Sequence, residues 1–192
     1  MANFGKAIAV VFSYELDPRD RLPSGGYRDG SGYVDDPEDP GGLTVWGISR
    51  QYLARPECRE VLGIVDLSRE SLAGIPQLCA EDWYRRFPWL TYSCEKLLDD
   101  VVATKYFDCV VNMGNGGVRV LQQACNALGA GLLLDGMPGP LTIASANAAD
   151  ARALVRWMGI YQFQAYVALC ARNQALRKFL SGWKTRATWP GA

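Results

Sequence analysis

The sequence predicts a mainly α-helical fold with a minor β contribution, and three observations carry that prediction. Apolar residues recur at helical spacing along most of the chain, most plainly over 97–114 and 150–180. Outside a loop rich in Gly, Pro and Asp at 16–44, no segment shows a strong strand pattern. With 192 residues and 49% hydrophobic composition, the chain has ample material for a buried core. We therefore expect one helical domain or two small lobes.

The first expected helix covers residues 3–15, NFGKAIAVVFSYE, with Asn3 as its N-cap. The helix should stop near Asp17-Pro18, because the residue before a proline disfavours helical geometry. Glu15 is therefore predicted to lie in the last turn, where an apolar helix meets a loop.

That loop, residues 16–44, is too rich in Gly, Pro and Asp to be a helix. Loops of such length in compact proteins are usually functional or mobile. We expect a small hairpin around Tyr27 and Tyr33, with Asp29-Gly30 at its turn.

From Thr44 onward the pattern is helical again. The region 97–114 carries apolar residues around most of its circumference, so it is predicted to be a central, buried helix. Two short helices are expected to begin near Ser49, with Ser49 as N-cap, and near Ser68. Two more are expected at 79–90, with a break at Pro88, and at 115–129. The last two should begin at Thr142 and cover 150–180, with an interruption near Asn173.

The chain contains no histidine. Ser-His-Asp and Cys-His hydrolases both need an imidazole base, and catalytic zinc sites usually take His ligands. Any proton chemistry should therefore fall to carboxylates, and we expect no cofactor and no metal. The 20 basic and 20 acidic residues balance, so charge gives no case for a nucleic-acid partner.

Six cysteines stand at positions 58, 79, 94, 109, 125 and 170, and none forms a CxxC pair. We expect mostly buried free thiols, with three disulfides as the alternative. The apolar stretch 7–12 is short and lacks a small-residue cleavage site, so we read it as helix and expect synthesis in the cytoplasm without a signal peptide. We expect no stable membrane insertion.

Carboxylates are densest early in the chain. A calcium loop is one interpretation, but the order DDPEDPGG lacks the alternating EF-hand spacing and holds two prolines. A solvated acidic turn is a second, and acid–base catalysis on a sugar is a third. Glycoside hydrolysis needs a protonated acid in an apolar setting and an ionised partner in a polar one. Glu15, at the end of an apolar helix, suits the acid, and Asp36 or Asp39 suits the partner.

These residues, in this order, resemble glycoside hydrolase family 108, lysozyme-like muramidases common among phage endolysins. The segments that carry the resemblance are Glu15, Gly32-Tyr33, Asp36-Pro37, Asp39-Pro40-Gly41-Gly42, Thr44 and Trp46-Gly47-Ile48-Ser49. FDCVVNMGNGGVRVLQQACNALG and LLLDGMPGPLT are similar to the peptidoglycan-binding-type helical region that usually follows. The resemblance implies a catalytic segment at 1–95 and a peptidoglycan-binding-like lobe at 96–192.

The resemblance implies a lysozyme-like fold with two lobes and a cleft, and hydrolysis of the β-1,4 bond between N-acetylmuramic acid and N-acetylglucosamine. It makes Glu15 the general acid and Asp39 the base, and Thr44 positions the attacking water. The residues expected to bind substrate are Tyr33, Asp36, Trp46 and Asn112.

Several alternatives stay open. In the family the acid directly precedes Gly-Gly-Tyr, so residues 16–31 are either an insertion or Asp29 is the acid. Asp36 competes with Asp39 for the second carboxylate. Thr44 is equally a cap or turn residue, and Asn112 a helix C-cap. Core packing, rather than sugar stacking, is expected of the four helical tryptophans Trp83, Trp89, Trp157 and Trp183.

The expected partner is bacterial peptidoglycan, bound by a monomer that acts at the cell wall or periplasm. By the same resemblance, export should depend on a phage holin. Two rival functions remain. A non-catalytic wall-binding or virion structural protein could keep the fold, and a lytic transglycosylase needs one Glu and no water-activating partner.

Overall fold

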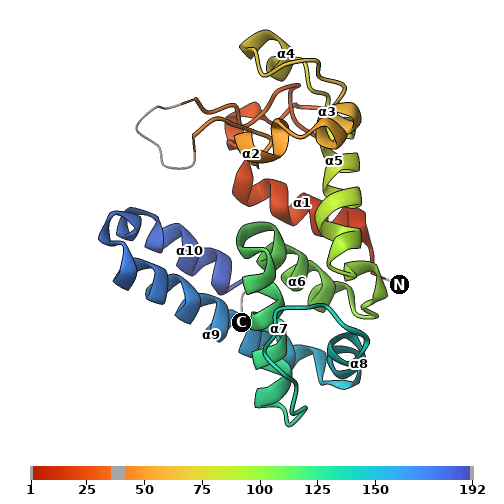
Figure 1. Cartoon of the computed structure of the whole chain (residues 1–192), viewed down its shortest axis with the longest axis vertical. Coiled ribbons are helices and arrows are strands. Elements are labelled where there is room, and N and C mark those ends of the chain that lie inside the picture. Colours follow the sequence, from red (N-terminus) through yellow and green to blue (C-terminus); the bar gives the residue numbers. More distant parts are fainter. Residues whose placement is uncertain (1, 36–41, 191–192) are drawn as a thin grey trace. The chain divides into compact units, whose positions relative to one another are not determined.

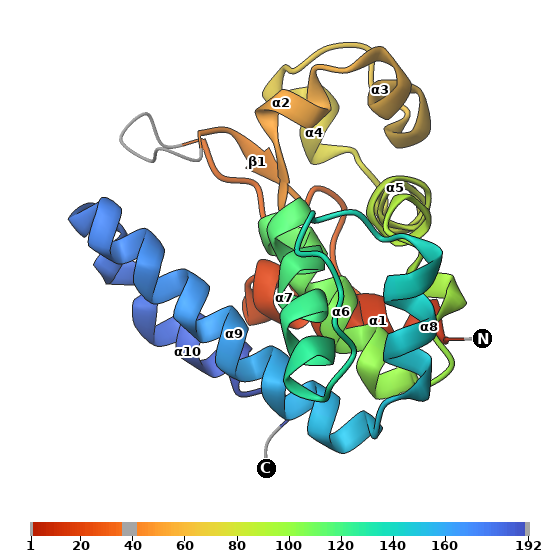
Figure 2. The ribbon, with the colours of Figure 1, turned by 60° about the horizontal axis from the view of Figure 1, so that its bottom comes forward.

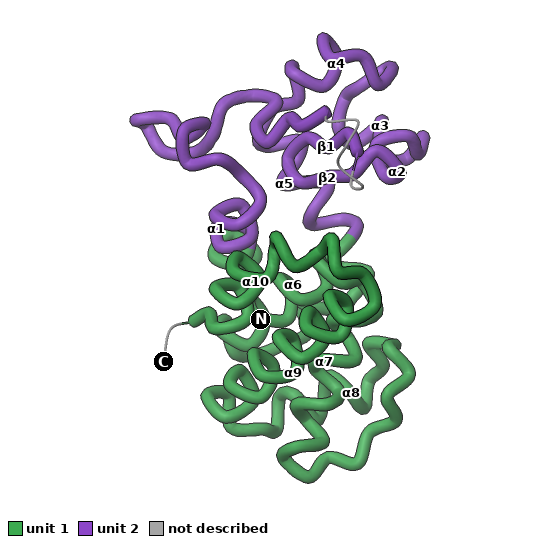
Figure 3. Tube along the Cα trace, turned by 90° about the vertical axis from the view of Figure 1, so that its left-hand side faces the viewer, with its two compact units in different colours: residues 1–7, 88–192 green, residues 8–87 purple. Residues whose placement is uncertain are grey.

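The computed structural model describes residues 2–35 and 42–190, which form two compact units. Unit 1 comprises residues 1–7 and 88–192, and unit 2 comprises residues 8–87 (Figure 3). The division falls after residue 87, and residues 1–7 belong to unit 1. The reason is aromatic packing, because the Phe4 ring lies 5.4 Å from that of Trp89 and 5.9 Å from that of Phe107.

Helix α1 (Phe4–Glu15) starts in unit 1 and continues into unit 2. Its N-cap is Asn3, whose side-chain Oδ1 accepts the Lys6 N–H at 3.1 Å, as predicted. The helix ends before Pro18, where Asp17 caps a short 3-10 turn by accepting from the Arg19 N–H. Glu15 is the last residue of α1, so both predicted ends of this helix are confirmed.

Unit 2 holds a small hairpin at residues 44–49, directly before the helix that was predicted to begin near Ser49. Strand β1 (Thr44–Val45) pairs antiparallel with β2 (Ile48–Ser49) across a two-residue turn, Trp46-Gly47. Both turn residues have positive φ, 55° and 73°, which is the geometry of the commonest tight hairpin turn. The prediction of a hairpin around Asp29-Gly30 was wrong, because Tyr27 bridges Arg21 instead of a strand through Tyr33.

The remaining elements of unit 2 are short helices. Ser68 caps α4 by accepting the Ser71 N–H, whereas Ser49 occupies the N-cap position of α2 without a side-chain bond. Helix α5 changes to one π-helical turn that contains Pro88 and leads into unit 1. The helices are α2 (Arg50–Leu53), α3 (Pro56–Leu62), α4 (Arg69–Ala73), α5 (Gln77–Tyr84) and the π-helical turn Arg85–Trp89.

Unit 1 is built around α6 (Asp100–Met113), in which residues 102–110 are all buried. Helices α6, α7 and α9 pack against one another, and α10 lies alongside α9 (Figures 1 and 2). The predicted central helix is thus confirmed. The other elements are the 3-10 turn Cys94–Lys96, α7 (Asn115–Ala127), α8 (Pro140–Ala148), α9 (Ala151–Arg172), the 3-10 turn Gln174–Phe179 and α10 (Leu180–Ala187).

Local sequence explains where the long helices of unit 1 begin and end. Asp99 caps α6 by accepting from two N–H groups of its first turn, and Asp150 caps α9. Helix α9 ends at Arg172 because Asn173 adopts an extended conformation and caps the following turn, as predicted. Gly117 lets α7 cross α6 closely, since a Cβ there would lie 2.5 Å from the Cys109 carbonyl.

All six cysteines are free thiols, five of them buried and Cys79 half-buried. Burial raises the pKa of Cys109 to about 12 and that of Cys125 to about 11, which keeps both protonated and unreactive. Within the described ranges 2–35 and 42–190, no helix has the length and apolar character to cross a membrane.

Candidate active site

Glu15 is half-buried at the end of α1 and packs on the hairpin turn of unit 2. A Cβ at Gly47 would lie 3.0 Å from Glu15 Cβ and 3.1 Å from Glu15 Cγ. Any side chain at Gly47 would therefore crowd the stem of Glu15. The turn fixes the place from which the Glu15 carboxyl projects.

The turn is itself held by Trp46, which is fully buried. The Trp46 backbone N–H donates to the Ser31 carbonyl at 2.7 Å, and its indole Nε1–H donates to the Ile75 carbonyl at 3.0 Å. The Tyr84 hydroxyl donates to the Trp46 carbonyl at 2.9 Å. The structure thus places Trp46 in the core rather than at a sugar-binding surface. Its burial supports the strained positive φ of a non-glycine residue.

Aromatic rings form an apolar floor beneath this turn. Phe12, three residues before Glu15, has its ring 5.4 Å from that of Trp46 and 5.6 Å from that of Tyr84. The Tyr27 ring lies 6.1 Å from Phe12 in an edge-on arrangement. Glu15 therefore stands at the edge of a tightly packed aromatic cluster.

Thr44 lies in strand β1, and Tyr33 directly precedes Val34, which forms an isolated bridge with Thr44. Thr44 and Val34 exchange two backbone hydrogen bonds, of 2.8 and 2.9 Å, and Thr44 is half-buried. Thr44 is a strand residue rather than a helix cap. The half-buried Tyr33 lies under the Arg69 guanidinium at 5.5 Å, and its hydroxyl donates to Asp35 at 3.4 Å.

The two candidates for the second carboxylate, Asp36 and Asp39, lie outside the described residues. In the sequence they fall between Val34 and Thr44, the residues that pair on either side.

Residues 16–31 form a loop that begins after Glu15 and ends beside it. A Cβ at Gly32 would lie 2.9 Å from Leu16 Cδ2, 3.5 Å from the Glu15 carbonyl oxygen and 3.5 Å from the Trp46 nitrogen. The Gly32-Tyr33 motif therefore begins beside Glu15, although sixteen residues separate Glu15 from Gly32 in the chain.

The excursion over residues 16–31 is packed against the rest of unit 2. The Gly30 N–H donates to the Ile75 carbonyl at 2.9 Å, and the Tyr27 N–H donates to Gln77 Oε1 at 2.7 Å. Asp29, the rival acid, is exposed on this excursion.

Asn112 belongs to unit 1, in the last turn of α6, and is exposed. Its Oδ1 accepts the Tyr166 hydroxyl of α9 at 2.9 Å, so this oxygen bonds to another helix. The C-cap position of α6 is held by Gly114.

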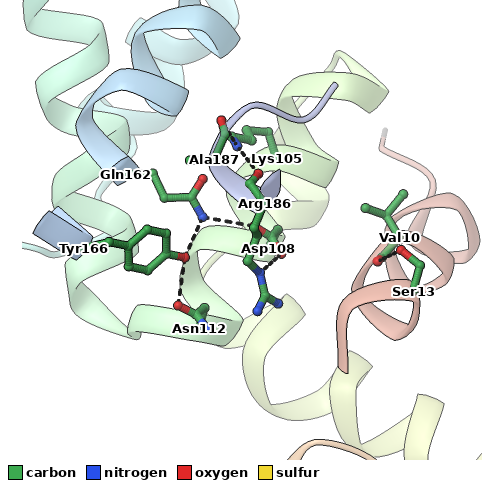
Figure 4. Close-up of polar contacts among 9 residues, drawn as sticks. All are labelled: Val10, Ser13, Lys105, Asp108, Asn112, Gln162, Tyr166, Arg186 and Ala187. Atoms are coloured by element: carbon green, nitrogen blue, oxygen red, sulfur yellow. Dashed lines mark hydrogen bonds and ion pairs between the residues drawn. The ribbon is translucent and has the colours of Figure 1, made fainter. Parts of the chain in front are cut away.

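The sequence did not predict a polar network that is connected to Asn112 through Tyr166 (Figure 4). Asp108 is 1% exposed and accepts from Arg186 Nε at 2.6 Å, and Gln162 is fully buried between Asp108 and Tyr166. Lys105 is also fully buried, and its Nζ donates to two carbonyls at the end of α10. The available signal was a pair of charged residues, Lys105 and Asp108, within the mostly apolar stretch 102–110 of the central helix.

Burial sets the proton states around this network. Desolvation lowers the pKa of Lys105, with nearby Asp108 partly opposing it. Desolvation raises the pKa of the Tyr166 phenol well above its usual range, so Tyr166 keeps its hydrogen. In the part of the chain that the structure describes, no group of three His, Cys, Asp or Glu side chains is placed to hold a metal ion.

Comparison with known proteins agrees with this architecture. Residues 27–114 match the Glycosyl hydrolase 108 family, and residues 116–188 match the family described as "Predicted Peptidoglycan domain". The structure of Brucella abortus SagA is similar, with a TM-score of 0.62 and 24% identity over 96% of this chain and 92% of that one. No curated protein matches the chain.

Together these findings define a glycosidase that acts on peptidoglycan, with an all-α, lysozyme-like fold as predicted. The chain joins a glycosyl hydrolase 108 segment to a peptidoglycan-domain segment, which confirms the resemblance drawn from the motifs. The first match begins at Tyr27, so it includes Asp29 and Asn112 but not Glu15. Its end at residue 114 places α6 with the glycosidase family.

Proposed function

We propose that this protein is a muramidase that hydrolyses the β-1,4 bond between N-acetylmuramic acid and N-acetylglucosamine. The observation that carries the proposal is the packing of Glu15 on the Gly47 turn, in the same hairpin whose first strand holds Thr44. In this proposal Glu15 protonates the leaving glycosidic oxygen. Asp39 takes a proton from water, and the Thr44 hydroxyl orients that water.

The choice of Glu15 over Asp29 rests on how the chain returns to α1. Gly32 lies beside the Glu15 carbonyl, so removing residues 16–31 in thought would leave Glu15 next to the Gly-Tyr motif. This supports the interpretation of 16–31 as an insertion. Asp29 is exposed, whereas Glu15 borders an aromatic floor that suits a proton-donating acid.

The remaining roles follow the resemblance. We assign Tyr33 and Asn112 to substrate binding and keep Asp36 as the alternative second carboxylate. Trp46 supports the turn instead of binding sugar. A mechanism of two carboxylates and a hydroxyl needs no imidazole, which suits a chain without histidine.

The biological setting is also a proposal. We expect a phage-type endolysin that works as a monomer at the cell wall and reaches it through a holin. The family resemblance is the support for these three points.

The test is a turbidity assay on purified cell walls, combined with mass spectrometry of the released fragments. Glu15→Gln should lower the rate at least about 100-fold, the usual contribution of general acid catalysis. Glu60→Gln, an exposed glutamate on α3, is the matched control and should be as active as wild type. Asp39→Asn and Asp36→Asn identify the second carboxylate by which one abolishes turnover.

Three results would overturn parts of the proposal. Full activity of Glu15→Gln with loss of activity in Asp29→Asn would move the acid to Asp29. Products ending only in 1,6-anhydromuramic acid would make the protein a lytic transglycosylase. Binding to insoluble walls without new reducing ends would make it a non-catalytic wall protein.

A further inference from the structure

We propose that Tyr166 is a positioning residue that fixes the side-chain amide of Asn112, so that its N–H donors face the glycan and bind an acetamido carbonyl. The ligand's identity rests on the proposed function, whereas the orientation of the amide follows from unit 1 alone. Four hydrogen-bonded side chains connect a buried charge to the exposed Asn112 amide (Figure 4).

The directions of these hydrogen bonds are set at Asp108. Its Oδ1 accepts from Arg186 Nε at 2.6 Å, and the two side chains are 2% and 8% exposed. An ionised carboxylate accepts hydrogen bonds and donates none. Whatever faces its second oxygen, Oδ2, must therefore be a donor.

Gln162 faces that oxygen. Its Nε2 lies 3.1 Å from Asp108 Oδ2 and 3.1 Å from the Tyr166 hydroxyl oxygen. Rotating the amide by half a turn would bring its oxygen against the carboxylate, in a fully buried place where an unmade bond is costly. Asp108 thus dictates that Gln162 offers its NH₂ group to Tyr166.

Tyr166 in turn sets the orientation of the Asn112 amide. Because its oxygen accepts from Gln162, its single hydrogen is left for Asn112 Oδ1, at 2.9 Å. The ring cannot easily turn away, since it stacks on Trp183 at 4.7 Å and 20°. The oxygen of Asn112 is therefore held toward α9, and its NH₂ points away from Tyr166.

This orientation selects the chemistry of the ligand. Asn112 is exposed, and its nitrogen has no acceptor among the described residues. A donor pair with a fixed direction favours a carbonyl oxygen and disfavours an ammonium group. N-acetylated sugars present such a carbonyl, and de-N-acetylated sugars present the ammonium. Asn112 should therefore favour N-acetylated glycan.

Two variants distinguish the loss of the Asn112 N–H donors from the loss of the Tyr166 hydroxyl that orients them. Tyr166→Phe keeps the stacked ring but removes the hydroxyl, so the Asn112 amide is free to rotate. Asn112→Asp keeps an acceptor for Tyr166 but removes both donors. Tyr161→Phe, on the same helix and stacked on Trp157, is the matched control outside the network.

The first readout needs no turnover. The Asn112 side-chain amide signal, identified by its absence in Asn112→Asp, is followed by NMR while tri-N-acetylchitotriose is added. We expect a saturable shift in wild type and Tyr161→Phe, and about 3- to 10-fold weaker apparent binding in Tyr166→Phe, the range for one hydrogen bond. Equal binding by wild type and Tyr166→Phe would overturn the proposal.

The second readout is kinetic, on N-acetylated and partly de-N-acetylated cell walls. Tyr166→Phe and Asn112→Asp should raise KM about 3- to 10-fold on acetylated walls, leave kcat within about twofold and reduce the preference for acetylation. A purely structural role of Tyr166 would lower the melting temperature and leave KM and the preference unchanged, which refutes the proposal. Absent wall cleavage with an intact NMR response would refute the muramidase function alone.

Discussion

The contact between Gly47 and Glu15 gives the sharpest test of how the fold positions the candidate acid. In Gly47→Ala the new methyl would lie 3.0 Å from Glu15 Cβ, 3.0 Å from the Tyr84 hydroxyl oxygen and 3.1 Å from Glu15 Cγ. Ordinary contacts of this kind are about 3.5–4.0 Å. Glu15 must therefore shift, or the turn must open.

Two terms set the size of the effect on stability. Gly47 has a φ of 73°, and a left-handed conformation costs an alanine about 1–2 kcal/mol. Overpacking adds about 1–3 kcal/mol, so Gly47→Ala should lower the free energy of unfolding by about 2–5 kcal/mol. At these distances Glu15 must give by a few tenths of an ångström. A displacement of about 1 Å can cost about 100-fold in turnover, so we expect a smaller, several-fold loss of activity.

Gly63→Ala is the matched control, because Gly63 caps α3 at a φ of 70° and a Cβ there meets nothing within 4 Å. It should lose only the backbone cost, about 1–2 kcal/mol, and keep full activity. The assays are urea unfolding followed by tryptophan fluorescence and the turbidity of purified walls. If both variants lose the same stability and both clear walls at the wild-type rate, Glu15 does not pack on this turn as described.

Two further predictions concern the pH dependence of folding. Burial lowers the pKa of Lys105 in the folded state, so at this residue the unfolded chain binds more protons between that lowered pKa and 10.5, and the contribution of Lys105 to stability should rise with pH in this window. Because the raised thiol pKa values of Cys109 and Cys125 make stability fall with pH in both proteins, the effect of Lys105 is read as a difference. Urea titrations should show that wild type gains stability relative to Lys105→Met as the pH rises through this window, and identical pH dependence of the two proteins would contradict the prediction. Bonds from Ser68 and Ser71 lower the pKa of Asp66 to about 2. Its contribution is complete above pH 3.8 and should be lost as the pH falls toward 2, and Asp66→Asn should remove that acid-dependent step.

Local chemistry alone determined the helical framework. Asn3 caps α1, Pro18 forbids its continuation, and Asn173 ends α9, each through bonds or sterics within a few residues. The central helix was evident because apolar residues surround most of its circumference. The sequence also determined the family, because the order of the motifs and the missing histidine depend only on residue type and spacing.

Tertiary contacts decided the rest. The sequence predicted that Trp46 binds sugar, but its indole bond to the Ile75 carbonyl, 29 residues away, holds it buried in a hairpin turn. Residues 16–31 proved to be an excursion because Gly32 returns to Glu15. The orientation of the Asn112 amide depends on Tyr166, 54 residues later. Sequence spacing determines which residues share a helix face, whereas these features depend on which faces meet, and only packing of the whole chain fixes that.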